Sequence, residues 1–357
     1  MITDLETSTN WRILWMSVED IYLLPPMSKE NEIAHPHDRL TRHFLVDPEL
    51  TAGLLENYVE SDIVGLLDLK RLRCESTVHV DKHLAQVIGD LRFSTVFKKT
   101  QRKSNVFVFV EHQSTVDDLI CFRALEQVVK AFREYIDMAK DDGGSRPKSF
   151  PYPIIVVLYH GKRPWGKLKR MHDLLDGIPD LPKDFLDFFP IFLIDLSLIP
   201  PEQLKGHPAL QALLETLQLG SKEKLEAGFD RVTSRLTAVR NDPRAEGWMK
   251  ALINYTISIC RIGQEVIFKS FAKILSEKEA RKMAMSTMQE LILEGKVEGK
   301  VEGKRDAILD VLKGRFGKVP KAISDTVNSY SDLTALTSLV VFAGTCESLD
   351  DFKDGLR

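Results

Sequence analysis

The chain has 357 residues, of which 43% are hydrophobic and 28% charged, and its net charge at pH 7 is −3. This length predicts about two domains, and the composition is typical of a soluble globular protein. No apolar run reaches the roughly 18 residues of a membrane span, and the first residues lack a secretory signal. We therefore expect a cytoplasmic protein without membrane contact.

The N-terminal part of the chain predicts two helices after an irregular start. Residues 1–30 show no sustained hydrophobic period, so we expect a poorly ordered N-terminal extension. A short helix is expected to begin near Asp38, where apolar residues follow at helical spacing. A second should begin at Asp47-Pro48-Glu49, because aspartate is a good N-cap and proline fits the first turn.

The hydrophobic period changes from that of a helix to that of a strand from residue 76, where Val78 and Val80 alternate with polar neighbours and predict a first strand. Residues 90–97 and 106–110 are rich in β-branched and aromatic side chains, and the polar residues 98–105 between them suit a hairpin. The second of these strands runs directly into Glu111-His112-Gln113.

A long helix is expected next. Ser114 or Thr115 would cap it, with Asp117 and Asp118 in its first turn. Its apolar residues follow one another three or four positions apart, which predicts that they form the stripe that faces the core. This stripe consists of Phe122, Leu125, Val129, Phe132 and Ile136.

Two near-continuous apolar runs, 153–159 and 190–195, predict strands that are covered on both faces. The order helix, three strands, helix, strand, strand indicates an α/β core with a central mixed sheet flanked by helices, which we assign to residues 31–200. Residues 201–293 are expected to form a mostly helical region, and residues 305–357 a small helical C-terminal domain.

Residues 294–304 repeat glutamate, glycine and lysine every four positions, which would place Gly295, Gly299 and Gly303 on one side of a helix. Each glycine costs a helix about 1 kcal/mol relative to alanine, and glutamates four residues apart repel each other. The sequence leaves two alternatives open. The repeat is either a flexible linker or a helix stabilised by the close approach of another backbone, as in a homodimer through the C-terminal region.

The chemistry of the chain is expected at the end of the strand 106–110. Side chains alternate across a sheet, so Glu111 and Gln113 should share one face and His112 the other. Asp90 begins the preceding strand, and hairpin pairing can bring it close to Glu111. Two carboxylates there would form an oxygen site for a hard divalent ion such as Mg²⁺, which can activate water and stabilise charge on a phosphate.

Positive charge gathers in segments that contain no acid, although the net charge is negative. One such segment lies between Arg92 and Lys103, and another begins at Lys162. Local positive patches suit contacts with phosphate groups. The residues predicted to make these contacts are Arg92, Lys98, Lys99, Arg102, Lys103, Lys162 and Arg163.

Four segments in chain order resemble a known family. They are His37-Asp38-Arg39-Leu40-Thr41-Arg42-His43-Phe44, Gly89-Asp90, Val108-Phe109-Val110-Glu111-His112-Gln113-Ser114 and Leu158-Tyr159-His160-Gly161. Together they resemble the recombination-promoting nuclease family, whose members are often labelled "putative transposase", in the PD-(D/E)XK nuclease superfamily. The glutamate-glycine-lysine repeat and the ending Leu312-Lys313-Gly314-Arg315-Phe316-Gly317 are similar to the C-terminal region of this family.

The resemblance implies a restriction-endonuclease-like core and a metal-dependent DNA endonuclease, associated with recombination or mobile elements. It implies double-stranded DNA as the partner, bound by the basic residues named above. It makes Asp90 and Glu111 the metal-binding carboxylates, with the main-chain oxygen of His112 as a further ligand. Gln113 takes the position of the superfamily's lysine, which removes a cation from the site, and could orient the attacking water. Asp38 is implied as a further catalytic acid that acts on the metal through a water.

Three other residues are expected to support the site. His37 precedes Asp38 on the first helix, and Tyr159 and His160 close a buried strand at the same edge of the sheet. A zinc site at His79 and His83 is disfavoured, because this pair lacks the glutamate of the HExxH motif.

Two other functions stay open at this point. The first is a three-acid transposase with strand transfer, for example through Asp90, Asp195 and a later glutamate, which requires the two aspartates on adjacent strands. The second is a non-catalytic DNA-binding or interaction protein that retains the nuclease fold.

Overall fold

The computed structural model describes residues 36–59, 62–75, 91–98, 105–141, 147–175, 189–220, 222–260 and 264–356. Several of the predictions fall on other parts of the chain. These are the N-terminal extension 1–30, the first predicted strand at Val78 and Val80, the acid Asp90, the cations Lys99, Arg102 and Lys103, and the histidine pair His79 and His83.

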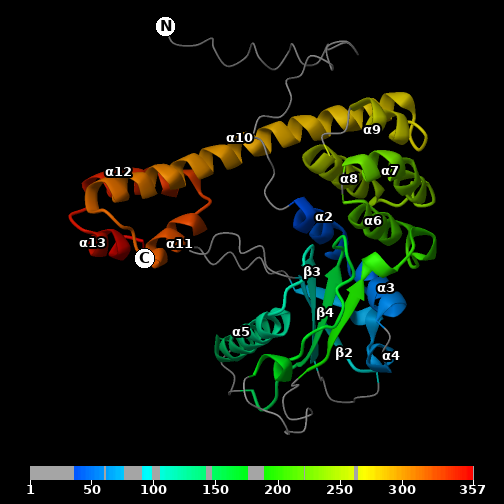
Figure 1. Cartoon of the computed structure of the whole chain (residues 1–357), viewed down its shortest axis with the longest axis horizontal. Helices are drawn as coiled ribbons and strands as arrows, with labels where there is room; N and C mark the ends of the chain where they lie inside the picture. Colours follow the sequence, from blue (N-terminus) through cyan, green and yellow to red (C-terminus); the bar gives the residue numbers. More distant parts are fainter. Residues whose placement is uncertain are drawn as a thin grey trace.

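Within the described residues, five strands form one mixed sheet in the order β1-β2-β3-β4-β5 (Figure 1). β2 is antiparallel to both of its neighbours, β1 and β3, and β4 and β5 continue parallel to β3. This confirms the predicted α/β class with a central mixed sheet. The strands are β1 Arg73–Glu75, β2 Leu91–Val96, β3 Asn105–Gln113, β4 Tyr152–Tyr159 and β5 Ile191–Asp195.

Helices cover both faces of the sheet, because the side chains of β3 alternate between two hydrophobic clusters. Phe107 and Phe109 pack with the long helix α5, Ile120–Asp141. Val106, Val108 and Val110 pack with the helices of the opposite face. These are α2 Pro36–Leu45, α3 Pro48–Tyr58 and α6 Pro208–Leu219, and the short helix α4 Asp62–Leu66 lies beside them.

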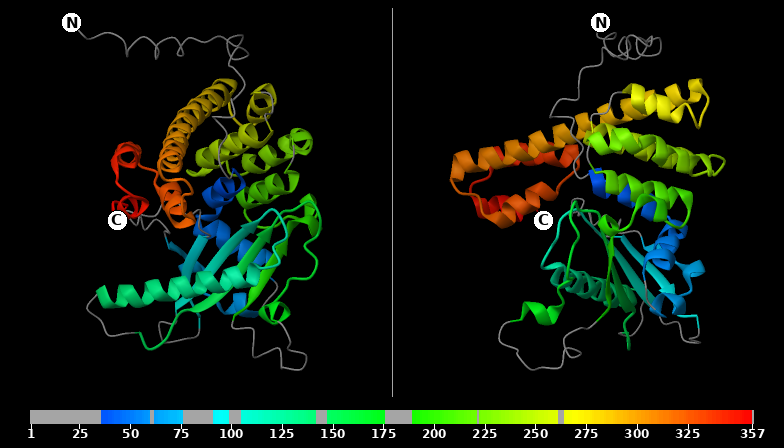
Figure 2. Two further views of the ribbon diagram at one scale, coloured as in Figure 1. Left: turned by 60° about the vertical axis from the view of Figure 1, so that its left-hand side comes forward. Right: turned by 45° about the vertical axis from the view of Figure 1, so that its right-hand side comes forward.

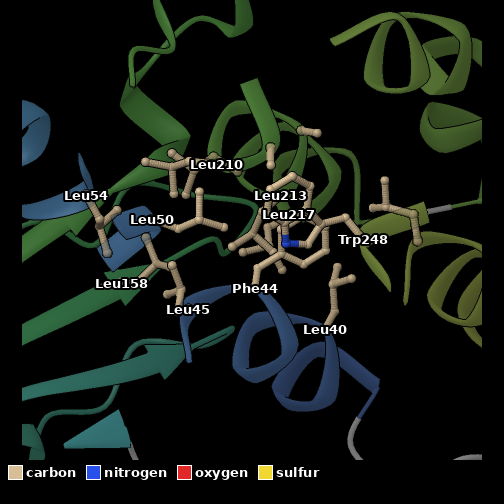
Figure 3. Packing of buried hydrophobic residues seen from close by; sticks show 14 of the residues in the cluster. Leu40, Phe44, Leu45, Leu50, Leu54, Leu158, Leu210, Leu213, Leu217 and Trp248 are labelled. Atoms are coloured by element: carbon tan, nitrogen blue, oxygen red, sulfur yellow. The ribbon is translucent and has the colours of Figure 1, made fainter. Parts of the chain in front are cut away.

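The core on the α2 side joins the sheet to the helices that follow it. Phe44 of α2 stacks on Trp248, with ring centroids 6.2 Å apart, and leucines of α2, α3 and α6 surround this pair (Figure 3). Leu158 of β4 contributes from the sheet, and the residues from Ile154 to Leu158 are all fully buried. The prediction of a strand covered on both faces is therefore confirmed.

The start of α3 follows its sequence signal. Asp47 precedes the helix, and its Oδ1 accepts the amide N–H of Glu49 at 2.9 Å, while Pro48 occupies the first turn. Short 3-10 helices connect other elements: η3 Leu69–Arg71, η4 Met171–Leu174, η6 Leu196–Leu198 and η7 Pro201–Gln203.

The prediction for α5 was wrong in two respects. The helix begins at Ile120, after a turn in which Asp117 accepts the N–H of Leu119 at 2.8 Å, and not at Ser114 or Thr115. Its buried side carries small residues such as Ala124 and Ala131, whereas Phe122 and Val129 are 45% and 41% exposed. The aromatic rings of β3 fill the space on this face of the sheet, so only small side chains let the helix approach.

The C-terminal region is helical, as predicted, and ends in a separate small core. A 40-residue helix, α10, runs from the α7–α9 group to this core (Figure 1, Figure 2). None of the helices in the described part of the chain has the length and apolar character of a membrane span. The helices are α7 Lys222–Thr237, α8 Ala245–Cys260, α9 Gln264–Phe271, α10 Glu277–Phe316, α11 Lys321–Ser329, α12 Leu333–Thr345 and α13 Leu349–Asp354.

The repeat 294–304 lies inside α10, so it forms a helix and not an irregular linker. The helix starts with a capping box, in which Ser276 and Glu279 satisfy each other's amides. A Cβ added at Gly303 would meet nothing within 4 Å. The close approach of a second backbone in a homodimer stays a prediction.

Candidate active site

The end of β3 presents different groups to the two faces of the sheet. Glu111 and Gln113 lie on the α5 side, where the Gln113 side-chain amide donates to Glu111 Oε2 at 3.3 Å. His112 lies on the α2 side, where its Nδ1 is 2.8 Å from Asp38 Oδ1. This is the alternation that the sequence predicts.

Glu111 is a fully buried carboxylate, and α5 supplies two polar partners in addition to Gln113 of β3. The Gln127 amide donates to its Oε1 at 2.5 Å, and the guanidinium of Arg123 lies 3.2 Å from its Oε2. Arg123 and Gln127 are four residues apart and so project from the same side of the helix. A buried carboxylate without partners would destabilise the fold by several kcal/mol, so these donors are what permits its position.

Arg123 also reaches the outer edge of this network. Its Nη1 lies 2.9 Å from Asp117 Oδ2, in the turn that precedes α5. The side chain of Arg123 is 43% exposed, whereas that of Glu111 is not exposed at all. The sequence analysis missed both Arg123 and Gln127. The signal was present, because they are polar residues at i and i+4 in the helix that directly follows the Glu111 strand.

The donor chemistry of this site suits a hard divalent cation, since a carboxylate and an amide oxygen are ligands of that class. Among the residues that the structure describes, no group of three or more histidine, cysteine, aspartate or glutamate side chains is placed to hold a metal ion. The second predicted carboxylate, Asp90, lies outside those residues. Its meeting with Glu111 therefore stays a prediction.

Asp38 lies on the opposite face of the sheet, beside a cluster of three histidines. His160 stacks on His112 with ring centroids 4.5 Å apart, and His37 lies 4.8 Å from His160. The Tyr255 hydroxyl is 2.9 Å from His37 Nδ1. Asp38 thus contacts His112 from the face opposite to Glu111, and its predicted role at the metal stays untested.

Two histidines of this cluster, His37 and His160, are held in the neutral state. Burial, and then the neighbouring His112, lower the pKa of His160 to about 3. The same two effects, partly opposed by Asp38, lower the pKa of His37 to about 4. At neutral pH these rings therefore carry no charge next to the strand that holds Glu111.

Tyr159 shapes the turn at the same edge of the sheet. It pairs with Gln113 in the parallel register and donates its hydroxyl to the Arg163 carbonyl at 2.7 Å. Burial, followed by the charge of Asp195, raises the pKa of this phenol, which keeps it a donor. A Cβ at Gly161 would lie 2.0 Å from the Tyr159 hydroxyl oxygen, so this turn requires glycine.

The four predicted basic residues that the structure describes, Arg92, Lys98, Lys162 and Arg163, do not form one surface. Lys162 and Arg163 are exposed and follow β4 at the same end of the sheet as Gln113. Lys98 follows β2 at the opposite end, where Val96 pairs with Asn105. The six residue-to-residue steps from Asn105 to Glu111 correspond to about 20 Å of strand.

The side chain of Arg92 is paired inside the protein and is not available on the surface. Its side chain is largely buried, with the guanidinium 3.0 Å from Glu75 and 2.7 Å from Glu134. It also lies over the Phe107 ring, 5.2 Å from the centroid. Arg92 therefore ties the sheet to α5, and we leave it out of the DNA-binding set.

The three-acid arrangement is not supported by the sheet order. Asp90 directly precedes β2 in the sequence, and Asp195 ends β5, but β3 and β4 lie between these two strands. Asp195 accepts the amide of Trp165 at 2.7 Å and that of Ser197 at 2.9 Å. It therefore caps local turns, and among the described strands β2 and β5 are not neighbours, so the sheet order gives this example of a three-acid site no support.

Comparison with known proteins assigns this chain to a family. Residues 35–246 match the model of the family described as "Putative transposase, YhgA-like". The recombination-promoting nuclease RpnA of Escherichia coli (strain K12) is 27% identical over 269 residues, which are 74% of this chain and 85% of RpnA. RpnD of Escherichia coli O157:H7, also named a recombination-promoting nuclease, is 28% identical over 248 residues, 68% of this chain and 88% of that relative.

A further relative carries a different name. The "Inactive recombination-promoting nuclease-like protein RpnE" of Escherichia coli (strain K12) is 24% identical over 272 residues, 74% of this chain and 84% of RpnE. No solved structure matches the chain significantly.

Proposed function

The chain belongs to the family described as "Putative transposase, YhgA-like", and on this premise we propose that it is a metal-dependent nuclease that hydrolyses phosphodiester bonds in DNA. Two relatives are named recombination-promoting nucleases, and a third is named inactive. The names support an association with nuclease activity and recombination. The main observation that supports a catalytic role is the fully buried carboxylate of Glu111 at the end of β3.

A contribution to the stability of the fold does not explain why a carboxylate is buried at this position. Replacing a buried ion pair by apolar residues of similar volume is often neutral or stabilising, and β3 is otherwise apolar from Val106 to Val110. The chain instead keeps Glu111 and three polar partners, Gln113, Arg123 and Gln127. Charged groups that are buried and held by polar partners are characteristic of functional sites.

Asp90 is the proposed second acid, and the register supports it. Leu91 pairs with Val110, so one further step of the antiparallel ladder would pair position 90 with Glu111. Alternation would direct position 90 to the side of Arg92, which contacts Glu134 of α5. The two carboxylates would then share the α5 side of the sheet.

In this proposal, Asp90, Glu111 and the main-chain oxygen of His112 hold a magnesium ion. The ion would supply stabilisation of phosphate charge and activation of water. Gln113, whose amide already bonds to Glu111, orients the attacking water or a phosphate oxygen. Lys162 and Arg163, at the same end of the sheet, bind the backbone of double-stranded DNA.

The test is cleavage of supercoiled plasmid DNA by the full chain with Mg²⁺. We expect nicking that EDTA abolishes and that Glu111→Gln slows by about 100-fold or more, the scale seen when a group that stabilises transition-state charge is removed. Glu126→Gln is the matched control, because Glu126 is an exposed carboxylate on α5. Asp90→Asn should behave like Glu111→Gln.

Retention of the full cleavage rate in both acid variants would overturn the assignment of the site. The alternative of a non-catalytic DNA-binding protein is kept because one relative is named inactive. The same assay can distinguish it from a nuclease. In that case the wild-type chain binds duplex DNA and cleaves none at any metal concentration.

A further inference from the structure

A positive charge from α5 lies beside the proposed chemistry. Position 113 holds an uncharged glutamine, so the strand itself contributes no cation beside Glu111. The guanidinium of Arg123 lies 3.2 Å from the buried Glu111 carboxylate. The site therefore contains a cation, although the sequence motif around Glu111 suggests that it has none.

Arg123 divides its contacts between the interior and the surface. One guanidinium nitrogen contacts Glu111, which is fully buried, and the other lies 2.9 Å from Asp117, whose side chain is 22% exposed. The position of Glu111 does not depend on Arg123 alone. Gln127 donates to one of its oxygens and Gln113 to the other.

We propose that Arg123 is an exchangeable counter-ion of Glu111. It balances the carboxylate while no divalent cation is bound, and it gives way when a cation binds there. Asp117 then keeps the guanidinium at the rim of the site, where it binds a phosphate oxygen of the DNA and supplies the charge that Gln113 lacks. This inference rests on the proposed metal-dependent nuclease function.

The physical reason is that a guanidinium and a divalent cation attract the same carboxylate and repel each other. Both cannot have their strongest contact with Glu111 at the same time. Arginine remains charged at all working pH values and binds phosphate oxygens with two parallel hydrogen bonds. A residue that leaves the carboxylate but stays anchored by Asp117 is therefore suited to bind the substrate.

The test uses calorimetric titration of the DNA-free full chain with Mn²⁺ as the probe. Arg123→Gln removes the competing charge, so it should bind Mn²⁺ more tightly, on the order of tenfold for a partly solvent-screened charge. Plasmid cleavage at saturating Mn²⁺ should nevertheless slow by about 100-fold or more, because the variant lacks the cation that stabilises the reacting phosphate. Arg133→Gln, an exposed arginine on the same helix, is the control and should match the wild type in both measurements.

The two readouts separate this inference from a purely structural role. An arginine that only holds the fold together would weaken both Mn²⁺ binding and cleavage when it is removed. If the wild type binds Mn²⁺ and cleaves DNA but Arg123→Gln binds Mn²⁺ no more tightly, the inference is overturned and the proposed function stands. If the wild type binds no Mn²⁺, both are overturned.

A second variant covers the case in which Arg123→Gln does not fold. Asp117→Asn removes the rim anchor from a partly exposed position, so the guanidinium should remain with Glu111. Mn²⁺ binding should then weaken several-fold, which is the opposite sign to Arg123→Gln. Unchanged or tighter Mn²⁺ binding by Asp117→Asn contradicts the exchange of counter-ions.

Discussion

Acid should destabilise this protein through the histidine cluster behind the proposed site. His160 packs against His112 and His37, and Asp38 lies beside them. The ring donates to the Leu217 carbonyl, but burial and the other two histidines lower its pKa to about 3. Protonation of the folded protein would therefore place a charge where it is poorly solvated.

The size of the loss of stability follows from the difference in the pKa of His160 between the folded and the unfolded chain. In the unfolded chain His160 has the ordinary pKa of 6.5, so it takes up a proton at a higher pH than in the folded protein. Stability is therefore lost as the pH falls below 6.5, and the loss ends only near the folded pKa. At pH 5 the loss from His160 is about 2 kcal/mol, at about 1.4 kcal/mol per pH unit.

Urea denaturation at pH 7.5 and at pH 5 measures this difference directly. The His160→Gln variant keeps an amide that can bond to the Leu217 carbonyl but does not titrate. Its loss of unfolding free energy between the two pH values should be smaller than that of the wild type by about 2 kcal/mol. Lys162→Gln, an exposed change two residues further along the chain, is the control and should keep the wild-type difference.

The comparison uses the change with pH, so a packing defect in the variant that acts equally at both pH values cancels. Equal losses of stability in the wild type and in His160→Gln would refute the conclusion that His160 is buried in its neutral form.

Two further predictions concern DNA binding and the long helix. In the double variant Lys162→Gln with Arg163→Gln, the slope of the logarithm of DNA affinity against the logarithm of salt concentration should become shallower by roughly 2. Each phosphate contact contributes about 0.9 to this slope. Fluorescence anisotropy with duplex DNA in EDTA measures the affinity. Lys98→Gln, at the other end of β3, is its control, and equal slopes in the double variant and the wild type would remove the assigned role. Gly303→Ala should stabilise the protein by about 1 kcal/mol in thermal unfolding, because alanine favours a helix and the added methyl meets nothing within 4 Å. Destabilisation, together with a change of mass in light scattering, would instead indicate that this glycine packs against a second copy.

Much of the local structure could be predicted from the sequence. The alternation of Glu111, His112 and Gln113, the start of α3 at Asp47, and the buried strand β4 all follow the predicted pattern. Each depends on residues that are close in the sequence, so short-range periodicity and capping chemistry suffice. The family was also visible in the chain, because its motifs are short continuous segments.

The partners of the candidate site could not be predicted in this way. Strand alternation shows that Glu111 faces away from His112, but it does not show which helix lies opposite. The prediction for α5 used the largest apolar side chains, whereas Phe107 and Phe109 on the sheet require small ones there. This shift brings Arg123 and Gln127 to Glu111.

The roles of the charged residues were likewise decided by the tertiary structure. Because Arg92 and Lys98 lie in one basic segment, the same role was predicted for both, yet the fold buries the first between two glutamates and places the second at the far end of β3. The sequence by itself determined which side chains share a strand face and where several helices begin. Only the packing of distant segments decided which charges meet, because the energy of an ion pair depends on distance and burial in space and not on separation along the chain.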